Sequence, residues 1–159
     1  MRLIVATIAL LTCLPLVAAP EHGPLHAQFL PPDEQSLRQG DPQQQLLQVT
    51  SYSVVMGNQR LSNQQPIPVT APMLLRLKGK ALSKDAKLAE VLITFDGESK
   101  SLKRPAFDEA SGTLALTYPL SQYRILLDLL RNDTVYVQFL SYPNGHVWAD
   151  LHTASVRAR

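Results

Sequence analysis

The sequence predicts a mainly β protein, an antiparallel two-sheet β-sandwich of about seven strands with one helix before a C-terminal hairpin. Three observations predict this fold. Short segments rich in β-branched and aromatic residues alternate with turn residues at intervals of about ten residues. One segment, residues 122–132, has apolar residues at helical spacing. Residues 134–153 have the pattern of a β-hairpin with a tight turn.

The first 19 residues predict a signal peptide. Arg2 precedes an apolar run that ends in small residues, which is the order of an export signal. The run contains Pro15 and is followed by no charged stop, so a transmembrane anchor fits less well. We expect cleavage after Ala18 or Ala19, a mature chain that begins near Pro20, and a periplasmic or secreted protein.

Cys13 is the one cysteine of the chain and lies inside this apolar run. A lipoprotein, with Cys13 as its lipidated first residue, is the alternative. Thr12 stands where a lipidation site has Gly, Ala or Ser, and the residues after Cys13 stay apolar. Export with cleavage is therefore favoured, and the mature chain then has neither a cysteine nor a disulfide. Packing alone must stabilise a single domain of ordinary size.

The charges of the chain are nearly balanced. It has 15 Lys and Arg against 13 Asp and Glu, and loss of Arg2 with the signal leaves 14 basic residues. This balance argues against nucleic acid or an anionic membrane as the main partner. The basic residues between Arg76 and Lys87 are interpreted as a solvated strand edge, and Arg157 and Arg159 as a solvated tail.

Residues 20–45 predict a flexible leader rich in Pro and Gln, because they hold too few apolar side chains to offset the entropy of ordering. His22 and His26 lie in this leader. Gly23 and Pro24 between them do not permit a helix with both imidazoles on one face, so we interpret both as spacer residues rather than metal ligands. The folded domain is expected over residues 46–156.

Five strands are expected before the helix. The apolar alternation is clearest where Leu75 and Leu77 share one side of a strand, and where Val91, Ile93 and Phe95 share one side of the next. A turn at Asp96 and Gly97 predicts a short return strand. In order, the expected strands are residues 46–56, 73–79, 89–95, 99–104 and 113–118.

The helix is expected over residues 122–132, with Ser121 as its N-cap. Its apolar stripe consists of Tyr123, Leu126, Leu127 and Leu130, and we expect it to pack on the sheet. An α+β sheet with this helix across one face is the alternative fold. The sandwich is immunoglobulin-like only in architecture, because the buried Cys and Trp signature of those domains is absent.

The hairpin turn is predicted at Pro143, Asn144 and Gly145, residues that suit a type I turn followed by a bulge. Side chains alternate along a strand, so this register separates two faces. The core face carries Val135, Val137, Phe139, Val147, Ala149 and Leu151. The opposite face, called the aromatic face below, carries the candidate binding residues Tyr136, Gln138, Leu140, Tyr142, His146, Trp148, Asp150 and His152.

No catalytic motif is recognisable by inspection, and the ionisable residues of the aromatic face do not form an obvious one. His146 and His152 are roughly 20 Å apart along one strand, too far to share a metal. Asp150 and His152 are close enough to form an acid and base couple. Their only neighbours in this register are Tyr136 and Gln138, which are poor ligands. We therefore expect a surface Asp-His pair, no metal and no cofactor.

The composition of the aromatic face favours an exported, non-enzymatic binding or accessory protein of the cell envelope that acts through protein–protein contacts. One alternative is a glycan-binding module using Tyr136, Tyr142 and Trp148. Another is a small hydrolase or metal enzyme around Asp150 and His152. The sequence leaves two states of the face open. It is either exposed for recognition, or covered by the helix or the leader, with Trp148 as second-layer core.

Overall fold

The computed structural model describes residues 26, 29–30, 36–57, 73–96 and 103–153. Within these residues the chain forms seven strands and a single α-helix. The strands are β1 (Gln43–Met56), β2 (Met73–Ala81), β3 (Glu90–Asp96), β4 (Ala106–Asp108), β5 (Thr113–Pro119), β6 (Val135–Ser141) and β7 (Val147–Thr153). The helix is α1 (Tyr123–Asn132), which follows the 3-10 turn η3 (Leu120–Gln122).

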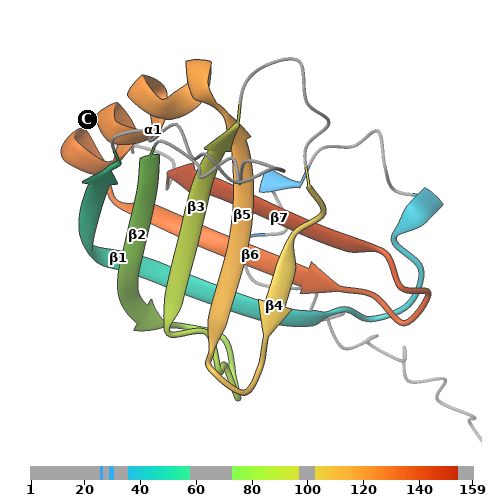
Figure 1. Cartoon of the computed structure of the whole chain (residues 1–159). Helices are drawn as coiled ribbons and strands as arrows, with labels where there is room; N and C mark the ends of the chain where they lie inside the picture. The colour runs from blue at the N-terminus through green and yellow to red at the C-terminus, as the bar shows by residue number, and fades with distance from the viewer. Residues whose placement is uncertain (1–25, 27–28, 31–35, 58–72, 97–102, 154–159) are drawn as a thin grey trace, which may run out of the picture.

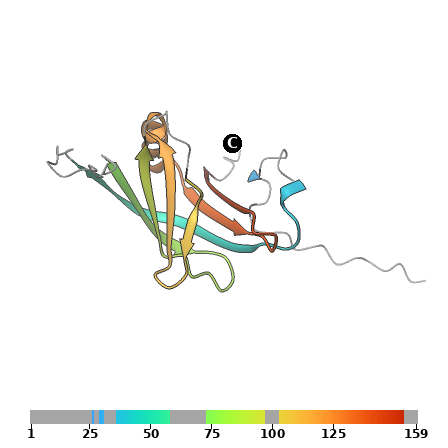
Figure 2. The same ribbon diagram turned by 45° about the vertical axis from the view of Figure 1, so that its right-hand side comes forward.

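All seven strands belong to one sheet in the order β4-β5-β3-β2-β1-β6-β7. Every neighbouring pair is antiparallel except β3 and β5, which run parallel. The sheet curls into a half-barrel, in which β6 and β7 cross the direction of β2, β3 and β5 (Figure 1). Figure 2 shows the two halves of the sheet opening away from each other, with α1 above the upright strands.

The mainly β composition and the position of the single helix are confirmed, whereas the two-sheet, purely antiparallel sandwich is not found. The difference arises after β3. The next described strand, β4, does not pair with β3. Instead, β5 inserts between β3 and β4 and runs parallel to β3. Of the expected return strand at residues 99–104, residues 99–102 lie outside the described residues, and Lys103 and Arg104 belong to no strand.

The long strand β1 links the two halves of the sheet. It pairs with β2 along most of its length, and its first half also pairs with β6. Its register against β2 shifts between Val49 and Ser51, so a bulge lies at Thr50, and bulges bend the strand that carries them. Gly79 lies opposite Val49 at this bulge. A Cβ atom on Gly79 would lie 1.9 Å from the carbonyl oxygen of Gln48, so the bend requires glycine here.

β1 begins at Gln43, three residues before the expected start of the folded domain. Glutamine is uncommon in strands, but the Gln45 side chain has a specific role. Its Oε1 accepts hydrogen bonds from the backbone N–H groups of Lys87 (2.8 Å) and Leu88 (3.1 Å). The amide therefore fixes the connection between β2 and β3 to the first strand, which apolar periodicity alone does not indicate.

The concave side of the half-barrel holds the hydrophobic core. The buried core residues are Leu47, Leu75, Leu77, Leu88, Val91, Ile93, Phe95, Leu114, Leu116, Leu126, Val137 and Phe139. Phe107 and Phe139 connect the two halves, with ring centroids 5.6 Å apart. Helix α1 contributes Leu126 to the core and places Tyr123 edge-on to Phe95 at 5.2 Å. Ser121 is not its N-cap, because the helix begins after the 3-10 turn and has no side-chain cap.

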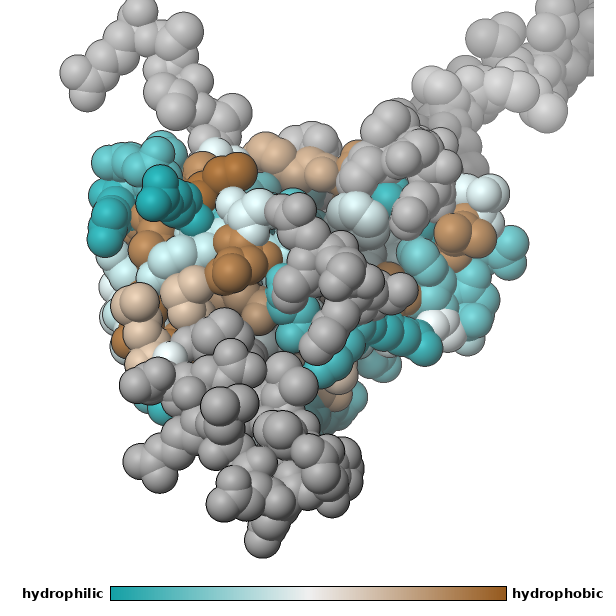
Figure 3. Space-filling model, turned by 45° about the horizontal axis from the view of Figure 1, so that its top comes forward, coloured by the Kyte–Doolittle hydropathy of each residue, from teal (hydrophilic) through white to brown (hydrophobic). Residues whose placement is uncertain are grey.

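Exposed apolar residues are scattered over the described surface. Figure 3 shows apolar residues in separate patches with hydrophilic residues between them. The large exposed apolar side chains are Leu37, Tyr52, Val55, Met56, Leu120 and Ile125. In the described part of the chain, no helix combines the length and the apolarity that crossing a membrane requires.

The bend of β1 predicts a large effect of Gly79→Ala. The new methyl group would overlap the Gln48 carbonyl, and β1 can relieve the overlap only by separating from β2. We expect urea denaturation to show a loss of about 2 to 3 kcal/mol in unfolding free energy. Gly145→Ala is the matched control, because Gly145 has a φ of 83° but no atom within 4 Å of the added Cβ. Backbone strain alone should cost about 1 kcal/mol there. Equal losses in the two variants would contradict the account.

Candidate functional site: the aromatic face

The predicted hairpin register is confirmed. Tyr136 pairs with His152, Gln138 with Asp150, and Leu140 with Trp148. Tyr142 N–H donates to the His146 carbonyl at 2.9 Å, which extends the register to the turn. Gly145 adopts a positive φ of 83°, and its N–H donates to the Tyr142 carbonyl at 2.9 Å. The eight predicted residues therefore lie on one face of the β6-β7 ribbon, opposite the core.

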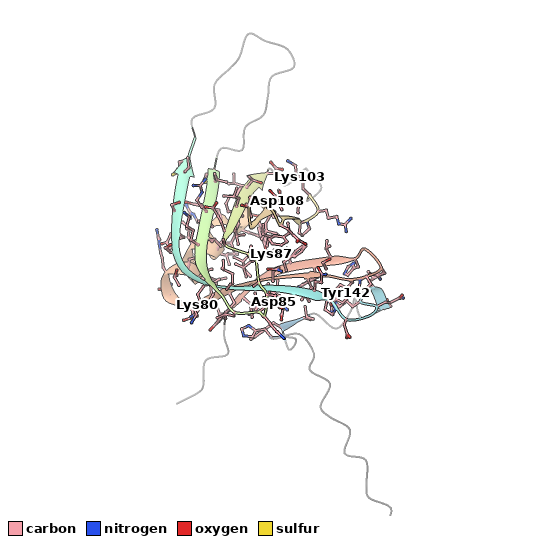
Figure 4. All side chains as sticks on the ribbon, turned by 90° about the horizontal axis from the view of Figure 1, so that it is seen from below. Lys80, Asp85, Lys87, Lys103, Asp108 and Tyr142 are labelled. Carbon is pink, nitrogen blue, oxygen red and sulfur yellow. The ribbon has the colours of Figure 1, made fainter. Side chains whose placement is uncertain are left out.

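This aromatic face is largely buried, and the leader covers it. Leu140 and Gln138 are 0% exposed, and Tyr142 is 6% exposed. Helix α1 packs against the concave core instead. Figure 4 labels Tyr142 at the end of the sheet, next to the short helical turn that precedes β1. Of the two states left open by the sequence, the structure therefore shows the covered one, with described leader residues as the cover.

Two contacts hold the leader near the hairpin turn. The guanidinium carbon of Arg38 lies 5.2 Å from the centroid of the Trp148 ring, a cation–π contact. Asn144 Nδ2 donates a hydrogen bond to the carbonyl oxygen of Leu37 at 2.8 Å. The side-chain oxygen of Asn144 also accepts from His146 N–H at 3.0 Å. Asn144 therefore stabilises the turn, as predicted, and in addition binds the leader backbone.

A second group of contacts lies at the other end of the face, around His152. Its Nδ1 lies 2.5 Å from Asp150 Oδ1, and its Nε2 lies 2.7 Å from Nδ1 of His26 in the leader. The other oxygen of Asp150 accepts from Trp148 Nε1–H at 2.5 Å. Phe29 stacks on the His152 ring with centroids 4.3 Å apart, and Tyr136 stacks on it at 5.8 Å. Indole, carboxylate and two imidazoles thus form one continuous chain of hydrogen bonds.

The predicted Asp150–His152 couple exists, but it is enclosed rather than solvent-exposed. The side chains of His152 and Asp150 are 9% and 15% exposed. Both ring nitrogens of His152 and both oxygens of Asp150 already have partners. His146 lies apart from this chain, beside Tyr142 at a ring distance of 5.7 Å. Among the described residues, no three His, Cys, Asp or Glu side chains are grouped so as to hold a metal ion.

Two pKa shifts accompany this arrangement. The pKa of His26 is lowered, first by burial and then by the neighbouring His152, while Asp150 acts in the opposite direction. The pKa of Tyr142 is raised by burial, an effect that Arg38 partly opposes. The shift at His26 follows from the docked leader, because docking buries this ring beside His152. At Tyr142 the leader acts the other way, because Arg38 reduces the rise in pKa that burial causes.

Sequence reasoning missed the leader residues of the site, which are His26, Phe29 and Arg38. The interpretation of His26 as a spacer residue considers only its neighbour His22, whereas its partner His152 is 126 positions away. The sequence nevertheless contains one indication that the leader docks on this face. The aromatic face carries Leu140 and Trp148 as well as polar groups, and such a face requires a cover. An aromatic residue in an otherwise polar leader is a candidate for that cover.

Comparison of the chain with protein-family models, with curated proteins and with solved structures gave no match. The functional argument therefore depends on the contacts of the aromatic face.

The docked leader predicts that truncation destabilises the domain without unfolding it. A chain that begins at Gln43 keeps every core residue, but loses the leader residues that contact Trp148 and His152. We expect a loss of about 2 kcal/mol relative to a chain that begins at Pro20, or a drop of roughly 10 °C in Tm by calorimetry. Identical melting temperatures would show that the leader contributes nothing to the fold.

Proposed function

We propose that the protein is an exported, non-enzymatic binding or accessory protein of the cell envelope, and that it binds a polypeptide segment of a protein partner on the aromatic face. One observation carries this proposal. The face already holds a segment of polypeptide, its own leader, through contacts to both side chains and backbone. A surface that accommodates one peptide segment in this way has the chemistry to accommodate another.

The leader contacts indicate which partner segment would fit. Trp148 offers its ring face to a guanidinium, and Asn144 offers an amide N–H to a backbone carbonyl. His152 offers a flat ring for stacking. A partner that presents a cationic side chain, a free backbone carbonyl and an aromatic ring would compete with the leader. Trp and aromatic residues of this kind are frequent anchors in protein interfaces.

The bonding of Asp150 and His152 supports a binding role over an enzymatic one. A general acid or base must present a nitrogen or oxygen to the substrate. In this couple, an Asp150 oxygen is bonded to Trp148, and Nε2 of His152 is bonded to His26. These atoms are therefore already engaged within the protein. The couple therefore organises the face. Export is supported by the sequence of residues 1–19, which lie outside the described residues.

Trp148→Ala tests this proposal. Removal of an interface anchor should weaken partner binding by about 2 kcal/mol, roughly thirtyfold in Kd. We would use the wild-type chain to capture partners from an envelope extract by photo-crosslinking, and then titrate the captured protein against purified variants. Tyr52→Ala is the matched control, because Tyr52 is a partly exposed ring of β1 on the other side of the sheet, opposite Leu77.

We expect Tyr52→Ala to bind the captured protein with wild-type affinity and Trp148→Ala to bind it much more weakly. Circular dichroism of each variant shows whether the fold is intact. A folded Trp148→Ala protein with wild-type affinity would contradict the proposal.

A further inference from the structure

We propose that His26 and His152 form a proton-controlled latch, which keeps the leader docked on the aromatic face at neutral pH and releases it in acid. The latch rests on the proposed function, because the surface that it uncovers is the one proposed to bind the partner.

The latch consists of three hydrogen bonds in series. Asp150 accepts from Trp148 Nε1–H and bonds to Nδ1 of His152, each at 2.5 Å. Nε2 of His152 faces Nδ1 of His26 at 2.7 Å. The first two bonds lie within β7, whereas the third joins β7 to the leader. Breaking that third bond therefore removes the hydrogen bond between this end of the leader and the sheet, and leaves the ring contacts of His26 and Phe29 to hold it.

Chemistry fixes the protons along this series at neutral pH. An indole N–H only donates, and an ionised carboxylate only accepts. His152 must therefore donate from Nδ1 to Asp150, which leaves a lone pair on Nε2. That lone pair accepts the proton on Nδ1 of His26. The two imidazoles consequently hold defined tautomers while both are neutral.

One added proton is compatible with docking. If it binds Nε2 of His26, the resulting imidazolium still donates from Nδ1 to His152, and Asp150 balances the charge. A second proton has only Nε2 of His152 to bind. Two N–H groups would then face each other across 2.7 Å, each on a positive ring. The hydrogen bond cannot survive this state, so the docked leader accommodates one added proton and the released leader two.

Few other ionisable groups act on this pair. From β7 it faces Asp150, and from β6 the Tyr136 ring, which lies 4.7 Å from His26. Tyr118 of β5 is coupled to Asp150, but burial raises the pKa of Tyr118 to about 12, so it stays neutral over the relevant range. Arg38 is the one Lys or Arg among the described leader residues, and it lies over Trp148. Asp150 is thus the single described carboxylate that compensates the two histidines.

The direction of the pH effect follows from His26. Its pKa is lowered in the docked state, so the released form binds protons more readily. Docking is therefore complete above the ordinary histidine pKa of about 6.5 and is lost as the pH falls through the lower, docked value. Because the released state holds one more proton, the docking equilibrium should weaken by up to about tenfold per pH unit in acid.

A spin label in the leader tests the latch directly. A chain that begins at Pro20 contains no cysteine, so Leu30→Cys accepts a single nitroxide. Leu30 is half-buried and next to Phe29, which stacks on His152. At pH 8 the label should broaden the amide signals of Tyr136 and His152. We expect these signals to recover as the pH falls below the ordinary histidine pKa of about 6.5, while the signals of core strand β3 stay unchanged.

Two variants isolate the histidine pair. In His26→Gln, the amide can donate to His152 or, when flipped, accept from protonated His152, so it should stay docked to low pH. His146→Gln is the matched control, because His146 is on the same face but outside the hydrogen-bonded series. It should keep the wild-type pH profile. A wild-type profile in His26→Gln, no recovery in the wild type, or loss of the β3 signals together with recovery would each overturn the latch.

This measurement contains no partner, so it separates the two proposals. A pH-independent leader together with Trp148-dependent partner binding would remove the latch and leave the proposed function intact. Release of the leader in acid, together with partner binding that does not depend on Trp148, would support the latch and contradict the proposed function.

Discussion

The close approach of β1 to Gly79 is the constraint on which the rest of this structure depends. β1 serves both halves of the sheet, and its bulge opposite Gly79 lies where pairing with β2 continues and pairing with β6 ends. Without that bend, the β6-β7 hairpin would extend the sheet instead of turning over the concave core. The bend thus sends Val137 and Phe139 into the core and turns the aromatic face outward. Fold and candidate site consequently have the same origin.

An outward face of this composition creates a second packing problem. β6 is buried on both sides, since Val137 lies in the core and Leu140, on the opposite face, is 0% exposed. The described leader residues pack on this face through a few specific contacts, made by Arg38 and His26, rather than through a continuous apolar stripe. Contacts of this kind are individually weak and partly electrostatic, so a competing polypeptide segment could displace the leader from this face.

Features set by local chemistry could be predicted from the sequence. The turn residues Asn144 and Gly145 and the alternation around them determine the hairpin register, and leucine spacing determines the helix. Features that depend on residues far apart in the sequence could not be predicted in this way. Nothing local indicates that β5 lies between β3 and β4, because the described part of the connection, residues 103–112, contains no helix to mark a crossover. Likewise, His26 in a polar leader has no local signal of its bond to His152.

The central claim is that the aromatic face is a peptide-binding surface occupied by the chain's own leader. Its most direct test is titration in trans, in which a synthetic peptide of residues 20–42 is added to a chain that begins at Gln43, at pH 8. The account predicts saturable one-to-one binding with amide shifts confined to β6, β7 and their turn, and weaker binding when the peptide carries Arg38→Ala. Absence of saturable binding to the folded domain, or shifts centred on α1 or the outer side of β2 and β3, would contradict it.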